Sequence, residues 1–424
     1  MTIPPLVKIA NQSPKPRQCQ RTTPPEAGPR DSVAPGVTDM RGSRPSAFST
    51  AEAAHWAVDA AVRAASMGTF GVGGALLGPH RELLALSCNR VLADGQLADP
   101  TAHGERQLVD WYFEQKSRGQ QLPPPEQCTI VSSLDPCMMC AGSILTGGFK
   151  VVSATLDTTA GVNYSADGSY PSLPADLRAK AQESFGYFGV EGGRSHQGPG
   201  PAEQISSDLE KRSLETFLAS LKAVQEKIHA TEGPAQDLRE CRDSEVLQTL
   251  QRLAPEALQL RFDPGQPGPE LAAPLLQAAR GGRSAAALLD PFGNLVMLRS
   301  GQEQQSPTRT AFMELTRDWA ALRRQAGPAG EPFLRPLKEC TVVSLWGPAA
   351  DSTGVMELGA YGSSVEGPLP ESELARFQYV LPRQSAEQLG QQIEQLPPLY
   401  SQIIRPRVEQ VKDPLLVQLC QNVP

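Results

Sequence analysis

Two short motifs constrain this 424-residue chain more than any other feature: His103-x-Glu105 and Pro136-Cys137-x-x-Cys140. Each stands where a helix is predicted to begin, and proline suits the first turn of a helix. A C-x-x-C pair at that position directs both sulfurs to one point, where the helix dipole favours thiolates. Imidazole and thiolate are preferred ligands of zinc, and a catalytic zinc keeps one position for water. We therefore predict a Zn²⁺ site held by His103, Cys137 and Cys140.

Glu105 is predicted to be the catalytic residue of this site. It follows His103 by two residues, close to the metal but not needed as a ligand. A carboxylate there can take a proton from water and return protons to a ring nitrogen and to departing ammonia. The combination of H-x-E with P-C-x-x-C is the signature of zinc deaminases that act on bases.

A structural zinc half-site or a redox pair is the alternative interpretation of C-x-x-C. A structural zinc needs a fourth protein ligand, and no other cysteine or histidine has a suitable spacing. Cys128 is near enough in sequence, but its apolar neighbours place it in a strand. Both alternatives also leave Glu105 unexplained.

The order of predicted elements favours an α/β fold. A capping box at Ser49 begins a helix, a hairpin and a second helix follow, and strands then alternate with helices. The expected ranges are a hairpin over 74–77 and 83–88, a helix over 101–115, a strand over 128–134, a helix from 136 and a strand over 150–156. We expect a three-layer mixed sheet flanked by helices.

Residues 70–170 resemble the cytidine-deaminase-like superfamily of zinc deaminases. The strings D-P-T-A-H-G-E at 99–105 and D-P-C-M-M-C-A-G at 135–142 place the resemblance nearest the branch of tRNA adenosine deaminases and guanine deaminases. It implies one zinc per site and hydrolysis of an exocyclic amine on a base. It also implies that Asn89 and the backbone of Gly104 bind the substrate. The chain departs from the branch at Gly104, where alanine is usual, and in a longer segment between Asn89 and His103.

The final third of the chain echoes the first domain. Cys128-Thr-Ile-Val-Ser132 matches Cys340-Thr-Val-Val-Ser344, and Asp110-Trp111 matches Asp318-Trp319. We interpret this as an internal duplication, with chance similarity of short strands as the alternative. The second copy lacks the ligands: Ala349 stands for Cys137, Ser352 for Cys140, Thr310 or Ala311 for His103, and Phe312 or Met313 for Glu105. A degenerate copy could act as the partner in an intramolecular pseudo-dimer.

These observations predict four regions. They are a disordered tail (1–48), a catalytic zinc deaminase domain (49–195), a linker with a helical segment (196–262), and a degenerate deaminase-like domain with C-terminal helices (263–424). The start of the chain lacks the apolar core of a secretion signal, and no stretch is long and apolar enough for a membrane span. We expect a cytoplasmic protein with no membrane partner.

The net charge of −7 favours a small substrate, namely a nucleobase, a nucleoside or a nucleotide, over a polynucleotide. One alternative is an editing deaminase of tRNA or single-stranded nucleic acid, which would bind its substrate in a salt-sensitive way. The other is a non-catalytic, zinc-stabilised interaction module, in which Glu105→Gln would change nothing.

Overall fold

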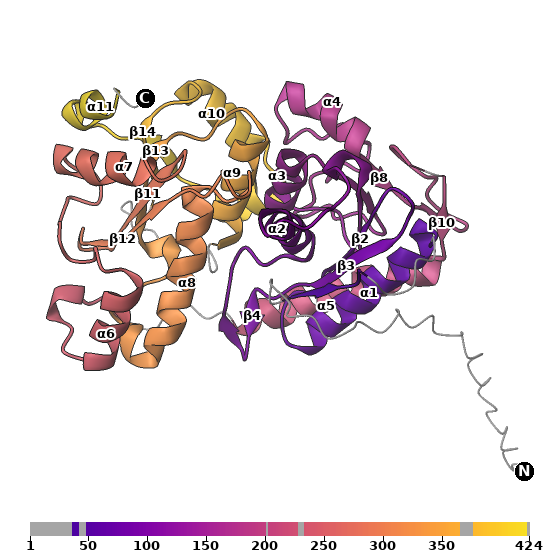
Figure 1. Cartoon of the computed structure of the whole chain (residues 1–424), viewed down its shortest axis with the longest axis horizontal. Coiled ribbons are helices and arrows are strands. Elements are labelled where there is room, and N and C mark those ends of the chain that lie inside the picture. The colour runs from indigo at the N-terminus through magenta and orange to yellow at the C-terminus, as the bar shows by residue number, and fades with distance from the viewer. Residues whose placement is uncertain (1–35, 42–47, 201, 228–232, 365–375, 422–424) are drawn as a thin grey trace, which may run out of the picture.

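The computed structural model describes residues 36–41, 48–200, 202–227, 233–364 and 376–421. They form two α/β halves that lie side by side, each built around its own sheet (Figure 1). The first half is residues 36–227 and the second half is residues 233–421, both with the gaps just given. Helices α2, α3 and α9 lie between the two sheets, in the middle of the molecule (Figure 1).

The first sheet has six strands in the order β1-β3-β2-β6-β7-β8. The four strands from β1 to β6 are antiparallel to their neighbours, whereas β6, β7 and β8 are parallel. The strands are β1 (Val37–Asp39), β2 (Gly73–Leu77), β3 (Leu83–Cys88), β6 (Thr129–Ser132), β7 (Lys150–Ser153) and β8 (Phe185–Tyr187). The predicted hairpin is therefore confirmed, and the sheet is mixed as expected.

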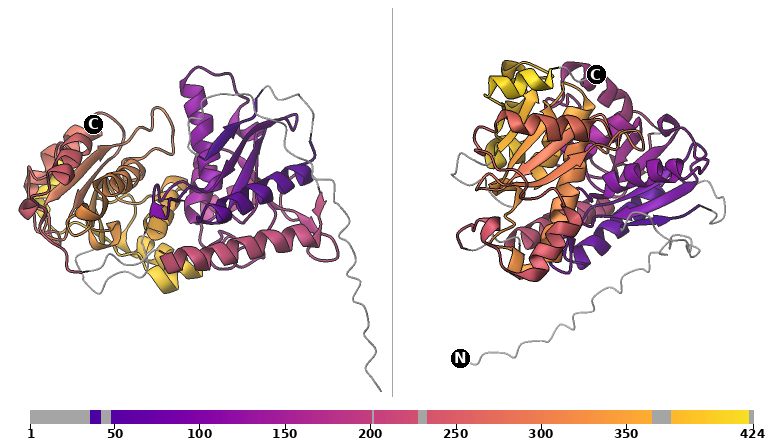
Figure 2. Two further views of the ribbon diagram at one scale, coloured as in Figure 1. Left: turned by 90° about the horizontal axis from the view of Figure 1, so that it is seen from below. Right: turned by 60° about the vertical axis from the view of Figure 1, so that its left-hand side comes forward.

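Alternation of buried side chains assigns the helices to the two faces of this sheet. Leu76 and Ile130 pack toward α2 (Gly104–Ser117) and α3 (Met138–Gly147), whereas Ala75 and Val131 pack toward α1 (Thr50–Ser66). Successive residues of a strand point to opposite faces, so both faces of these short strands are buried. The result is the expected three layers (Figure 2).

Helix α1 begins as the sequence predicts, with a capping box between Ser49 and Glu52. Helix α3 begins at Met138, two residues after the proline that was expected to open it, because Cys137 is the N-cap.

The aromatic side chains of Phe185, Tyr187 and Phe188 lie in the hydrophobic core.

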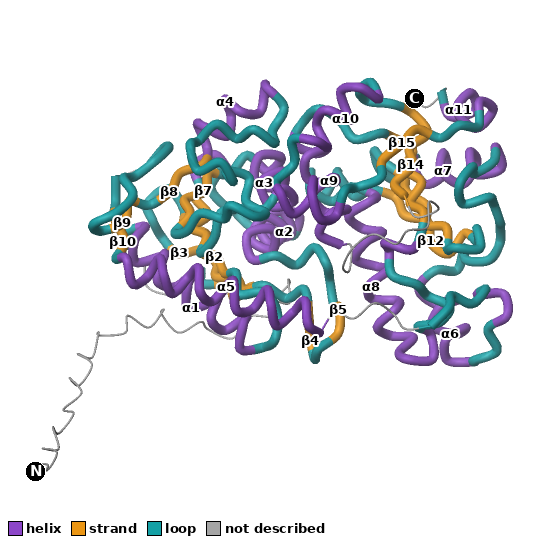
Figure 3. The backbone as a smooth tube through the Cα atoms, turned by 180° about the vertical axis from the view of Figure 1, so that it is seen from behind, coloured by secondary structure: helices purple, strands orange, loops and turns teal. Residues whose placement is uncertain are grey.

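Two segments differ from the predicted domain organisation. Val37–Asp39, inside the expected tail, pairs with β3, because Val37 and Met40 bury their side chains; the rest of that tail, 1–35 and 42–47, lies outside the described residues. Helix α5 (Ser207–Lys227), expected within a linker, packs along α1 (Figure 3). The Ser213 hydroxyl also donates to the Ser133 carbonyl at 2.6 Å. The first half thus extends through α5.

The second sheet has five strands in the order β12-β11-β13-β14-β15. Its strands are β11 (Ala285–Leu289), β12 (Leu295–Ser300), β13 (Thr341–Trp346), β14 (Arg376–Leu381) and β15 (Val408–Gln410). As in the first sheet, a hairpin leads into an antiparallel third strand and then into parallel strands. Both hairpins carry a register shift at the same place, between Leu76 and Leu77 and between Leu288 and Leu289.

Helices cover both faces of the second sheet. Phe312 and Trp319 of α8 pack on one face and Leu275 of α7 on the other. The helices of this half are α6 (Ser244–Leu253), α7 (Ala272–Ala279), α8 (Ala311–Gly330), α9 (Ser352–Ser364), α10 (Ala386–Glu394) and α11 (Pro414–Cys420). The remaining elements of the first half are α4 (Ala175–Ser184) and the short strands β4 (Leu92–Ala93), β5 (Gln96–Leu97), β9 (Gly189–Val190) and β10 (Gln204–Ile205).

The halves meet most closely where α3 crosses α9. A Cβ on Gly142 would lie 2.3 Å from the Met356 nitrogen, and one on Gly359 would lie 2.2 Å from the Met139 nitrogen. The Thr146 hydroxyl also donates to the Ser352 hydroxyl at 3.0 Å. Glycine therefore allows the two helix backbones to touch directly at this crossing.

None of the helices in the described ranges combines the length and apolar character needed to cross a bilayer.

Candidate functional site

The three predicted ligands come together at the starts of α2 and α3. His103 is the N-cap of α2 and Cys137 the N-cap of α3, and neither side chain caps its own helix. The ligand atoms of His103, Cys137 and Cys140 all lie within 4.8 Å of one another, with His103 Nδ1 3.4 Å from Cys137 Sγ. Within the described residues, it is the only group of three His, Cys, Asp or Glu side chains close enough to hold a metal.

This donor set fits zinc. One imidazole and two sulfurs are three of the four ligands that zinc takes in a tetrahedral site, which leaves one position open. A hydrogen bond from the Cys140 thiol is the largest of the effects that hold the pKa of Cys137 well below its usual range, and nearby His103 contributes. Burial acts in the opposite direction and is outweighed. Cys137 is thus predisposed to the thiolate form that a metal requires.

Glu105 lies beside the ligands and is shielded from solvent. Its side chain is 2% exposed. Its Oε1 accepts a hydrogen bond from the Ser132 hydroxyl at 3.1 Å, and its Oε2 lies 3.5 Å from the Cys140 sulfur. Burial raises the pKa of Glu105 to about 7. A carboxyl with that pKa exchanges protons readily near neutrality.

Asn89 offers a donor with no partner in the described structure. The residue is 1% exposed, and its Oδ1 accepts hydrogen bonds from the Thr69 hydroxyl at 2.7 Å and from the Val91 N–H at 3.0 Å. Among the described residues nothing accepts a hydrogen bond from its Nδ2. Buried amide groups normally have partners, so this N–H₂ group is available to a ligand.

Gly104 is the first residue of α2 and lies against β2. Its carbonyl accepts a hydrogen bond from the Ser87 hydroxyl at 2.7 Å. A Cβ here would lie 3.3 Å from Gly73 Cα and 3.3 Å from the Val72 carbonyl oxygen. The close approach of β2 is a physical reason for glycine at this position.

Sequence reasoning did not identify three residues that hold this site together. Ser132 orients Glu105, Thr69 orients Asn89, and Tyr400 of the second half packs in the hydrophobic cluster that contains Met138, the first residue of α3. Ser132 and Thr69 are separated from their partners by 27 and 20 residues and stand in no recognisable motif. Tyr400 lies in the other half of the chain, so no local pattern could have indicated it.

The second half has different residues at the matching positions. Thr310 is the N-cap of α8 as His103 is of α2, and Phe312 stands two residues later, where Glu105 does. At the start of α9, the Asp351 side chain accepts hydrogen bonds from the Thr353 and Gly354 N–H groups. By position relative to the helix start, Asp351 rather than Ala349 corresponds to Cys137, because Asp351 lies seven residues after Ser344 whereas Cys137 lies five residues after Ser132.

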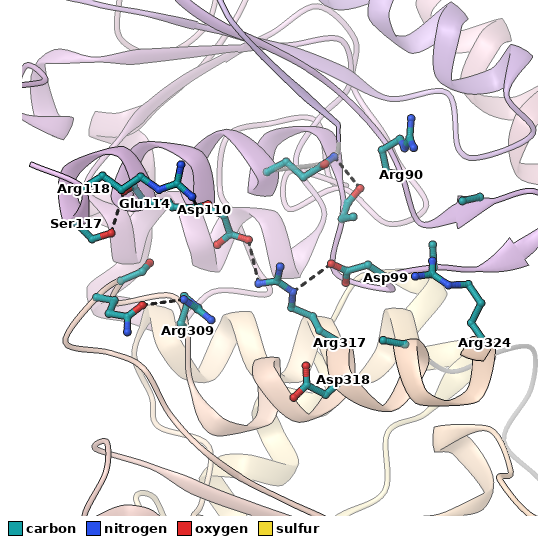
Figure 4. Close-up of a pocket in the computed structure, with 17 residues that line it drawn as sticks. Arg90, Asp99, Asp110, Glu114, Ser117, Arg118, Arg309, Arg317, Asp318 and Arg324 are labelled. Carbon is teal, nitrogen blue, oxygen red and sulfur yellow. Dashed lines mark hydrogen bonds and ion pairs between the residues drawn. The ribbon is translucent and has the colours of Figure 1, made fainter. Parts of the chain in front are cut away.

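A cavity of about 800 Å³ lies between α2 and α8, and it does not include the metal group (Figure 4). Arg317 of α8 crosses it, with its guanidinium 3.2 Å from Asp99 and 3.9 Å from Asp110. Gln107 and Glu114 line the same side of α2, whereas Leu108 and Tyr112 face the core. The cavity is therefore a feature of the contact between the halves.

Comparison with known proteins identifies the region that carries the site. Residues 49–155 match the family described as the cytidine and deoxycytidylate deaminase zinc-binding region. This span contains His103, Glu105, Cys137 and Cys140. Residues 49–155 belong to the cytidine-deaminase-like zinc deaminase superfamily. The resemblance seen in the sequence is thereby confirmed, and so is zinc as the cofactor of this deaminase region.

Solved structures of such deaminases also match. One comes from a study of A-to-I editing by tRNA:A34 deaminases at the wobble position; it is 22% identical, with a TM-score of 0.21, over 25% of this chain and 77% of that one. Another is a guanine deaminase from Nitrosomonas europaea, 15% identical with a TM-score of 0.26, over 42% of this chain and 86% of that one. No curated protein sequence matches the chain.

Proposed function

We propose that this chain is a zinc-dependent hydrolytic deaminase that converts the exocyclic amine of a nucleobase, nucleoside or nucleotide to a carbonyl and releases ammonia. The observation that carries the proposal is the burial of Glu105 beside His103, Cys137 and Cys140. Zinc, when bound by these three residues, supplies a Lewis acid that makes water a nucleophile near neutral pH. A purely structural site gives no reason for a buried glutamate two residues from a ligand.

Glu105 is the proposed proton carrier. With a pKa of about 7, its carboxyl can accept a proton from the attacking water and deliver protons to the ring nitrogen and to the leaving amine. The Ser132 hydroxyl fixes one carboxylate oxygen, which leaves the other oriented toward the ligands. A fixed orientation matters because proton transfer requires hydrogen-bond distance in the reacting complex.

Asn89 and Gly104 are the proposed substrate-binding residues. The unpartnered Nδ2 of Asn89 can donate to an acceptor atom of the base or its sugar, and Thr69 holds the amide in place to do so. The backbone of Gly104 is proposed to contact the base from the start of α2.

The test is ammonia release by the purified, zinc-loaded chain from a panel of bases, nucleosides, nucleotides and short RNA and DNA. Release from one small molecule, lowered about 10²- to 10⁴-fold in Glu105→Gln, is expected from the usual contribution of general acid–base catalysis. Glu357→Gln is the matched control, because it removes a buried glutamate from the second half and is expected to leave activity unchanged.

The other outcomes separate the alternatives. Release only from RNA or DNA, with salt-sensitive binding, would replace a small substrate with a polynucleotide. Equal ammonia release by wild type and Glu105→Gln would remove Glu105 from the mechanism. No release from any substrate, with zinc bound, would favour a zinc-stabilised interaction module.

We further propose that the second half is a degenerate copy of the first and serves as its partner in an intramolecular pseudo-dimer. The matching strand orders and register shifts support this. So does a shared side-chain arrangement: Tyr112 and Cys128 both donate to the Pro123 carbonyl, and Trp319 and Cys340 both donate to the Arg335 carbonyl. The two acceptors each lie five residues before the cysteine.

Separating the halves tests the pseudo-dimer. Residues 36–232 and 233–421 would be expressed as two chains, and we expect them to associate one to one and to regain activity only together. Met139 and Cys140 pack with the core of the second half, so the first chain alone exposes apolar surface at its own metal group. A first chain that is monomeric, stable and fully active by itself would remove the basis of this proposal.

A further inference from the structure

The segment before α2 carries the histidine ligand and contains no helix or strand. It runs over 98–103, from the end of β5 to the N-cap residue His103. Asp99 Oδ1 accepts hydrogen bonds from the Thr101 N–H at 2.8 Å and from the Thr101 hydroxyl at 2.7 Å, which folds the segment into a turn. The His103 N–H then donates to the Thr101 carbonyl at 2.9 Å. The position of the ligand therefore depends on how Asp99 is held.

The other carboxylate oxygen of Asp99 faces the second half. Arg317 of α8 places its Nε 3.2 Å from Asp99 Oδ2 and its Nη1 3.9 Å from Asp110 Oδ2 (Figure 4). One guanidinium thus joins a residue four positions before His103 to a residue seven positions after it. Because a guanidinium presents its donors in a rigid planar fork, it can hold two carboxylates at a set spacing.

A second contact between the halves fixes the first turns of α2. Arg106 is fully buried, and its Nη2 donates to the Asp110 carboxylate at 3.3 Å and to the Thr308 carbonyl at 3.4 Å. The Thr308 hydroxyl donates to the same carboxylate oxygen at 3.3 Å. Asp110 is therefore bound through one oxygen by Arg106 and Thr308, and it faces Arg317 with the other.

Stability gives little reason for the contacts of Arg317. Its side chain is 33% exposed, and ion pairs that exposed contribute little to the free energy of unfolding. The same contacts matter more for position, because a metal site binds tightly only when the groups around its ligands hold those ligands in place.

We propose that Arg317 is a positioning residue of the zinc site, which fixes Asp99 and Asp110 from the second half and through them the ligand His103. It acts through these two carboxylates rather than by contact with a ligand. The inference rests on the zinc site of the proposed function and does not depend on the substrate. It gives the second half, which lacks the ligands, a defined contribution to the metal site of the first.

The test is the zinc dissociation constant of the full chain, measured by competition with a chelator. Arg317→Ala is expected to bind zinc about 10-fold more weakly than wild type, at the lower end of the effect of groups that orient metal ligands. The difference between the two proteins should shrink as salt is added, because the contacts are partly exposed. Arg317→Lys keeps the charge and should recover part of the affinity.

Two further variants separate position from charge. Arg324→Ala removes the same charge from the same helix and the same cavity, but Arg324 forms no ion pair with a described residue, so zinc affinity should not change. Asp99→Asn keeps an acceptor for Thr101 and removes the charge that faces Arg317. In that background Arg317→Ala should weaken zinc binding far less than it does in wild type, because residues that act through one contact are not additive.

The outcomes separate this proposal from the proposed function. Equal zinc affinity in wild type and Arg317→Ala would overturn the role of Arg317, whether or not the chain deaminates, and so would an equal loss in Arg324→Ala. Weaker binding in Arg317→Ala that disappears in the Asp99→Asn background would support Arg317 even if wild type releases no ammonia, which would overturn the function alone. A wild-type chain that binds no zinc would overturn both. If Arg317→Ala fails to fold, Arg317→Gln removes the charge and keeps most of the side chain, and unchanged affinity in that variant would overturn the proposal.

Discussion

The two halves have the same arrangement of strands and flanking helices, but they differ at the helix starts, where the first half carries its metal ligands. In both, an N-cap residue with extended backbone begins the helix that follows the hairpin, but it is His103 in the first half and Thr310 in the second. At the start of the next helix, Cys137 points to the metal group while Asp351 caps its own helix. The sheet and its flanking helices therefore do not require a metal, and the metal site depends on side chains at two helix starts.

Each half also buries one glutamate whose pKa burial raises to about 7, Glu105 in the first and Glu357 in the second. The same physical state has different consequences in the two places. Glu105 lies beside three metal ligands, whereas Glu357 lies in α9 with no such group among the described residues around it. The first is expected to contribute to catalysis, and the second only to the pH dependence of stability.

The largest expected effect concerns the metal. His103→Ala removes one of three ligands and should reduce bound zinc from one per chain to a small fraction, because the remaining two sulfurs cannot hold the metal with comparable affinity. Thr310→Ala, the matching change in the second half, should leave the zinc content at one. Metal analysis of the two dialysed proteins checks this, and equal zinc in both would contradict the assignment of the site to the first half.

The second effect is on stability as a function of pH. In the folded chain the pKa of Glu357 is raised to about 7 from an ordinary value of 4.5, so folding favours its protonated form. That contribution is fully present below about pH 4.5 and is lost as the pH rises through 7. At pH 8 the buried carboxylate should cost about 3 kcal/mol. Glu357→Gln should therefore raise the free energy of unfolding at pH 8 and change it little at pH 5. Equal gains at both pH values in urea unfolding would argue against an ionisable origin.

The third effect concerns the crossing of α3 and α9. Gly142→Ala and Gly359→Ala each place a Cβ within 2.3 Å of backbone atoms of the other helix, so each should destabilise the chain by about 1–3 kcal/mol. Gly390→Ala in α10 is the control, because a Cβ there meets no atom within 4 Å, and helix propensity should stabilise it by up to about 1 kcal/mol. Thermal unfolding of the three variants measures the difference. Stabilisation by all three would mean that the helices cross less closely than described.

The smallest effect is electrostatic. Arg317→Ala removes the ion pairs of α8 with Asp99 and Asp110 across the cavity between the halves. Because the Arg317 side chain is 33% exposed, the loss of stability should be about 1 kcal/mol or less and should shrink as salt is added. Urea unfolding at low and high salt measures it. A larger loss that does not depend on salt would indicate that Arg317 acts through packing.

The local part of the fold and site could be predicted from the sequence. Helix caps, the hairpin and the two metal motifs are signals within a few residues, so Ser49, the strands over 73–77 and 83–88, and the ligand group were all found where expected. The correspondence between the halves stays a prediction. The equal Asp-Trp dipeptides pair Trp111 with Trp319, whereas the hydrogen bonds to Pro123 and Arg335 give Tyr112 and Trp319 the same contact.

Tertiary structure decided the rest of the fold and the surroundings of the site. Contacts between residues 20 to more than 200 positions apart decide that Val37–Asp39 joins the sheet and that α5 packs on α1. Such contacts also let Ser132 and Thr69 orient Glu105 and Asn89, and bring Tyr400 against α3. The sequence determined which residues could bind zinc and move a proton, because ligand chemistry and helix starts are local properties. Only the packing of the two halves determined which distant side chains surround those residues, because burial and hydrogen-bond partners arise when the sheets and helices are brought together.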